Sequence, residues 1–190
     1  AEPSTATSVR LTASDPLGES GFNYQTRWSD TQFAHPGAAY ATGDFGIRMP
    51  ASGSSFRFYG DSLTIENRTD PNGGLLFKGT GSSAVITIPS LVLAGGRIHH
   101  FSTTADVFRL AGRVTVASAS TIHAKQGTID IQSRVVGDGS LTLPVTDGPT
   151  EDLRYVRLLS PDNAYTGSIT VGGRFELAAG ANQRFALGAA

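Results

Sequence analysis

The sequence predicts an all-β fold, a right-handed parallel β-helix (β-solenoid) of about six coils with an irregular N-terminal cap. Short segments in which apolar and polar residues alternate indicate strands with one buried face. Glycine corners, such as Gly172-Gly173 between the segments 168–171 and 174–177, separate these strands. The unit of strand, glycine corner and strand also recurs upstream, at 91–98, 107–116 and 129–143. Together these observations favour a stack of similar coils.

The first part of the chain has a different composition, so we expect it to form the cap. A short strand near residues 9–13 precedes a segment, 14–50, that is rich in glycine, proline and aromatic residues. A solenoid must cover its open end, because exposed strand edges pair with other chains. We therefore assign residues 1–53 to an N-terminal cap segment of the same domain and residues 54–190 to the coils.

From residue 54 onward the apolar positions recur with a period of two, and no helical stripe persists. These strands are short for a β-sandwich, and their corners are glycines rather than Asn-Gly hairpin turns. Both features favour a solenoid over a sandwich. The alternation predicts that five apolar side chains point inward and are buried: Leu93, Leu110, Val116, Ile131 and Leu143.

The composition limits the function. The net charge is −1 without a basic stripe, which argues against a nucleic-acid partner. No apolar run approaches the ~18 residues of a membrane span. The absence of cysteine excludes disulfides and thiol chemistry. Only 16% of residues are charged, against about 25% in typical domains, and a polar start without methionine is typical of signal-peptide cleavage or a cloning boundary. We expect a secreted or cell-surface protein.

The segment 164–177, Ala-Tyr-Thr-Gly-Ser-Ile-Thr-Val-Gly-Gly-Arg-Phe-Glu-Leu, resembles the autotransporter-associated β-strand repeat, and 137–143 is similar to the strand that usually precedes it. Phe175 stands where the repeat has its first leucine. Segments 20–23, 58–63, 74–79 and 91–96 resemble a companion module of large secreted proteins in polysaccharide-degrading bacteria. This resemblance implies a parallel β-helix within an exported multi-modular protein, and the chain would then be a monomeric module of something longer.

Aromatic residues outside the repeating core provide the candidate ligand site. Sugar rings stack on tyrosine and tryptophan faces, while arginine and histidine supply directional hydrogen bonds. Because Phe58 and Tyr59 are neighbours on a strand, one of them must face outward. The candidate ligand-binding residues are Trp28, Tyr24, Tyr40, Tyr59, Arg57 and His100. The alternative for the N-terminal aromatics is that they only pack the cap.

The leading hypothesis is therefore a non-catalytic module that binds polysaccharide, without a cofactor or metal. A structural spacer or adhesin passenger is the first alternative. A polysaccharide lyase or hydrolase is the second, with Glu66, Glu151-Asp152 and Glu176 as candidate carboxylates. His99 and His100 are adjacent, so on a strand they point to opposite faces and cannot easily chelate one ion.

Overall fold

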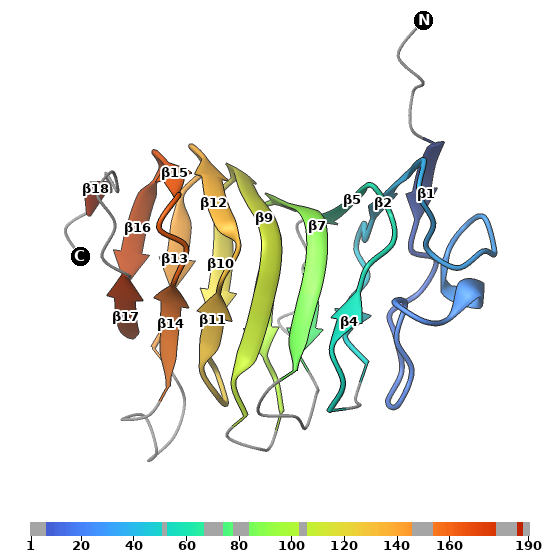
Figure 1. The fold of residues 1–190 in the computed structure, drawn as a ribbon, viewed down its shortest axis with the longest axis horizontal. Helices are drawn as coiled ribbons and strands as arrows, with labels where there is room; N and C mark the ends of the chain where they lie inside the picture. Colours follow the sequence, from blue (N-terminus) through green and yellow to red (C-terminus); the bar gives the residue numbers. More distant parts are fainter. Residues whose placement is uncertain are drawn as a thin grey trace, which may run out of the picture.

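A computed structural model describes residues 7–50, 53–66, 74–77, 84–102, 106–145, 154–177 and 186–187. Within them the chain is all-β, with parallel pairing throughout the named strands and one short 3₁₀ helix, η1 (Gln25–Arg27). Successive strands lie side by side along the long axis of the molecule (Figure 1). The predicted all-β class and the parallel solenoid are thus confirmed.

The strands form three rows that run along this axis. Row A contains β4 (Phe56–Arg57), β7 (Val85–Ala94), β9 (Phe108–Ser118), β11 (Ile129–Ile131), β14 (Tyr155–Leu158) and β17 (Arg174–Leu177). Row B contains β1 (Thr7–Arg10), β2 (Ala38–Ala41), β5 (Ser62–Glu66), the second halves of β7 and β9, β12 (Arg134–Gly137) and β15 (Ala164–Tyr165). Row C contains β3 (Ile47–Arg48), β6 (Leu75–Phe77), β8 (Arg97–His100), β10 (Ser120–His123), β13 (Leu141–Leu143), β16 (Ser168–Val171) and β18 (Ala186–Leu187).

Rows A and B belong to one sheet, because the long strands β7 and β9 pass from one row to the other. In β9 the first residues pair with β11 and the later ones with β12. The chain bends between these parts at Gly112, whose φ of +112° favours glycine. A Cβ at this position would lie 2.0 Å from the carbonyl oxygen of Ile88. The glycine thus allows both the bend and the close approach of the neighbouring coil.

Inward side chains of successive coils stack into one core. In row B, Leu63, Leu91 and Val114 occupy equivalent positions, and all three are buried. The five residues that we predicted to point inward are at most 2% exposed, which confirms the predicted alternation. Each buried aliphatic side chain removes apolar surface from water, and this burial contributes about 1.5–3 kcal/mol per residue.

The parallel ladders begin earlier in the chain than residue 54. Strand β1 pairs with β2, β2 pairs with β5, and β3 pairs with β6. The irregular part of the segment expected to act as a cap therefore lies between these strands, mainly in residues 11–37. An antiparallel bridge between Leu11 and Trp28 joins the start of this segment to its middle.

One row of ion pairs links neighbouring coils on the outer side of row A. Asp130 is buried and accepts hydrogen bonds from the Arg157 guanidinium, 2.6 and 2.9 Å long. The Arg109 guanidinium lies on the other side, 3.9 Å from the same carboxylate. These interactions and the register Arg109–Asp130–Arg157–Glu176 hold four successive strands in alignment.

Candidate functional site

The predicted site residues divide into an exposed group and a buried group. Tyr59 is 61% exposed, and Phe58 beside it is 1% exposed, so the expectation that one of the two faces outward is confirmed. Gly60 explains the direction of Tyr59, because a Cβ at Gly60 would lie 2.4 Å from the Tyr40 ring. The backbone passes close to the core at Gly60, and the side chain of Tyr59, the residue before it, points into solvent.

Tyr59 lies in an open pocket of about 460 Å³ between neighbouring coils. The lining residues come from β4, the turn after it, the loop before β2 and the bend of β7: Pro36, Arg57, Phe58, Tyr59, Gly60, Asp61 and Pro89. Two of the predicted site residues, Arg57 and Tyr59, therefore line one pocket. A tyrosine ring beside a guanidinium and a carboxylate offers an apolar face with polar groups at its rim.

The loop that carries Pro36 is held in place by two hydrogen bonds. The backbone N–H of Gly37 donates to the Asp61 carboxylate, at 3.0 Å. The backbone N–H of His35 donates to the hydroxyl of Tyr40, at 3.1 Å. Tyr40 is 1% exposed, so the structure places it beneath this wall of the pocket rather than in the pocket itself.

Trp28 and His100 are also buried, which differs from their expected role as ligand contacts. Trp28 is 1% exposed, donates from Nε1 to the Gly21 carbonyl at 2.7 Å and packs edge-on against Tyr40. His100 points into the core because it is in register with Phe77, whose ring it contacts. Neither ring presents a face to solvent. Tyr24 is 42% exposed but does not line the Tyr59 pocket.

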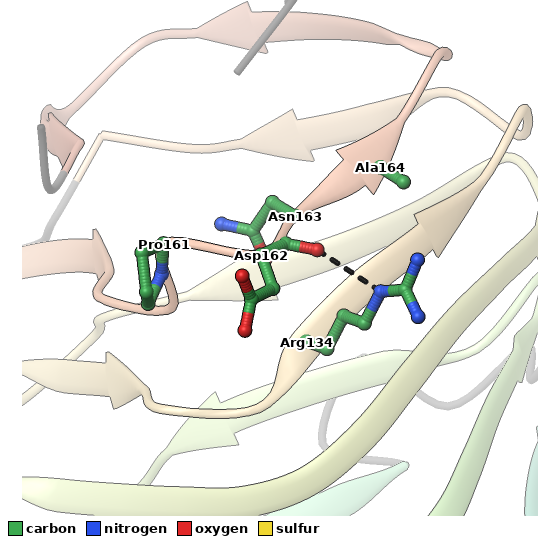
Figure 2. A pocket seen from close by; sticks show the side chains of 5 residues that line it. All are labelled: Arg134, Pro161, Asp162, Asn163 and Ala164. Carbon is green, nitrogen blue, oxygen red and sulfur yellow. Dashed lines mark hydrogen bonds between the residues drawn. The ribbon is translucent and has the colours of Figure 1, made fainter. Parts of the chain in front are cut away.

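A second open pocket, of about 450 Å³, lies three coils further along the same edge. Arg134, Pro161, Asp162, Asn163 and Ala164 line it. Figure 2 shows the Arg134 guanidinium bonded through Nε to the Asp162 carbonyl, 3.0 Å away, while the Asp162 carboxylate points in another direction. Asn163 is buried, and its side chain accepts from the N–H of Val135 and donates to the carbonyl of Ser160. It therefore shapes the pocket floor.

Both pockets belong to one row of residues, which we call the corner row: Asp61, Pro89, Arg113, Arg134 and Asp162. These residues stand where successive coils turn from row A to row B. None of these five residues is among the candidates drawn from the sequence, which include Arg57 and Tyr59 beside Asp61 but neither Arg113 nor Arg134. A signal for them existed, since the segments 107–116 and 129–137 align so that both arginines follow a small residue at the same corner.

Two histidines of β8, His99 and His100, have pKa values well below their ordinary range. Burial lowers the pKa of His99 to about 3 and that of His100 to about 4. The ring of His99 lies 5.6 Å from that of His123 in the next coil. Among the described residues no group of three or more His, Cys, Asp or Glu side chains could hold a metal ion.

The carboxylates considered for catalysis have other partners where the structure describes them. Glu66 is paired with Arg10 at 3.0 Å and also accepts from the N–H of Gly43. Glu176 is exposed and continues the charged row of Arg157. Glu151-Asp152 lies outside the described residues.

The comparisons with known proteins add no family or fold relationship. No family model matches the sequence, and neither a curated protein nor a solved structure is significantly similar to it. The described part of the chain contains no helix long and apolar enough to span a membrane. The corner row and the pockets beside it are therefore the features of the molecule that suggest a function.

Proposed function

We propose that this chain is a non-catalytic β-solenoid module that binds polysaccharide and belongs to a larger secreted or surface protein. The carrying observation is the open pocket in which the exposed ring of Tyr59 lies beside Arg57 and Asp61. A sugar ring can stack on the tyrosine while its hydroxyl groups bond to the two charged side chains. The low fraction of charged residues and the resemblance to the autotransporter-associated repeat support export.

We also propose that the solenoid is right-handed and has about six coils. A right-handed path is favoured because connections between parallel strands of one sheet are right-handed in about 98% of cases. A count of about six coils is supported by the row C strands, which follow one another at the intervals expected of such repeats.

Affinity gel electrophoresis tests the proposal with two matched variants. Tyr59→Ala removes the stacking ring from the pocket, whereas Tyr24→Ala removes an exposed tyrosine that lies outside it. We expect Tyr59→Ala to weaken retention by roughly tenfold or more, in line with 1–3 kcal/mol for a stacking contact, and Tyr24→Ala to behave as wild type. Equal retention of Tyr59→Ala and wild type would contradict this site.

A structural spacer is the second candidate. The shared carboxylate of Asp130 favours it, because it ties neighbouring coils together on the outer surface. A spacer predicts that the wild-type protein migrates unretarded in every polysaccharide gel. The same experiment therefore separates the two functions.

A further inference from the structure

Two arginines of the corner row stand directly opposite each other in adjacent coils. Arg134 of β12 is the Cα partner of Arg113 of β9. Both side chains are exposed, and they share the outer face of row B. Like charges opposite each other on neighbouring strands destabilise a sheet. The pair is therefore unfavourable in the free protein and would be relieved by an anion.

Within the part of the chain that the structure describes, neither arginine is paired with a carboxylate. Among the described residues no Asp or Glu oxygen lies within 4.0 Å of a guanidinium nitrogen of Arg113 or Arg134. The Asp162 carboxylate is turned away from Arg134, as Figure 2 shows. The bond from Arg134 Nε to the Asp162 carbonyl fixes the guanidinium and leaves its terminal nitrogens directed away from Asp162. Such a fixed fork suits an anionic group that accepts two hydrogen bonds.

The arginine pair is continuous with the Tyr59 pocket. The corner row runs from Asp61 through Pro89 to Arg113, Arg134 and Asp162, with one residue from each coil. At the usual strand separation these steps span about 19 Å. An extended chain lying along the solenoid axis could thus contact the pocket at one end and the arginines in the middle.

We propose that the corner row binds an acidic polysaccharide, with Arg113 and Arg134 together holding one of its carboxylate or sulfate groups. This inference rests on the proposed function and specifies its ligand class. Tyr59 stacks on a sugar ring, and the arginine pair selects for charge. Because both guanidinium groups are exposed, added salt screens the interaction and weakens binding.

Three gels test the ligand class: dextran sulfate, its uncharged parent dextran, and polygalacturonate, which carries carboxylates on a different backbone. We expect retention of the wild type by dextran sulfate or polygalacturonate, and which of these two retains it distinguishes sulfate from carboxylate. The double variant Arg113→Gln/Arg134→Gln should lose roughly tenfold or more in affinity for that gel. It should also show a flatter dependence of retention on salt.

The control variant Arg10→Gln/Arg48→Gln removes the same charge away from the corner row. It should be retained as the wild type is. Equal losses in both double variants would mean that retention follows net charge alone and would overturn the inference. Should the corner variant unfold, the single substitutions Arg113→Gln and Arg134→Gln serve in its place, because each leaves one arginine.

The remaining outcomes separate this inference from the proposed function. Retention by unmodified dextran alone, with loss in Tyr59→Ala and none in the arginine variant, would keep the polysaccharide function and reject the acidic ligand. Absence of retention by all three gels would reject both.

Discussion

The candidate ligand contacts form two groups: the aromatic cluster of the N-terminal segment (Trp28 and Tyr40) and the pocket of Tyr59 beside the corner row. The first group is buried, whereas Tyr59 is exposed. In the cluster, Trp28 and Tyr40 are 1% exposed, and their rings lie 4.7 Å apart between centroids. Beside the corner row, in contrast, Tyr59 is 61% exposed and lines an open pocket together with Asp61 and Pro89. Trp28 and Tyr40 therefore serve packing, whereas the outward ring of Tyr59 is accessible from solvent.

The largest expected effect concerns the cluster. Trp28→Ala should lower stability by about 3–5 kcal/mol, because it empties a fully buried site. Denaturant unfolding measures this loss, while gel retention well below the unfolding transition should equal that of the wild type. Wild-type stability combined with lost retention would reverse the comparison and make Trp28 a ligand contact.

The next effect is a pH dependence of stability that comes from Asp15, a buried carboxyl of the N-terminal segment. Asp15 accepts from the N–H groups of Gly21 and Arg48, and burial raises its pKa to about 6 from 3.8. The folded state therefore binds a proton that the unfolded state releases, so this group's contribution to stability falls as pH rises from about 4 to 6. The loss is on the order of 2–3 kcal/mol.

Asp15→Asn should abolish the decrease in stability that Asp15 contributes between about pH 4 and 6. Urea unfolding of wild type and variant at several pH values would detect the difference. His99 and His100 act in the opposite direction, since their lowered pKa values make stability rise with pH. Their contribution is common to wild type and variant and cancels in the difference between them. Parallel stability curves for the two proteins would contradict the assignment to Asp15.

Tyr40→Phe tests whether the buried aromatic cluster supports the wall of the Tyr59 pocket. Its hydroxyl bonds to the N–H of His35, next to Pro36 in the pocket wall. Removing this bond should cost about 1 kcal/mol of stability and weaken polysaccharide retention without touching the ligand. Weakened stability with unchanged retention would show that the wall holds its position without Tyr40.

The smallest expected effect lies in the corner row. Arg113→Gln should change stability by less than about 0.5 kcal/mol, with a gain favoured because it removes a like-charge pair. Thermal unfolding at low salt gives the clearest comparison, since salt screens the repulsion. A loss above about 1 kcal/mol would show that Arg113 has a structural role instead.

Much of the fold was predictable because alternation and glycine corners are local signals. The burial of Leu110 and Ile131 followed directly from period two. The pairing of β1 and β2 with the later strands could not be predicted in this way, because the irregular residues between them conceal the repeat. For the site, adjacency predicted that either Phe58 or Tyr59 is exposed, and the structure shows that it is Tyr59. The burial of Trp28 and Tyr40 depends on contacts between segments far apart in sequence, which no local pattern encodes.

The shared carboxylate of Asp130 has a mechanical consequence. The backbone hydrogen bonds of the ladders run along the solenoid axis, so a pull on the two ends loads successive strand pairs in series, and the weakest pair opens first. Around Asp130, opening on either side of β11 must also separate a buried charge from an arginine. Asp130 therefore makes the strands β9, β11 and β14 harder to separate, and rupture under tension should begin in coils that lack such an ion pair.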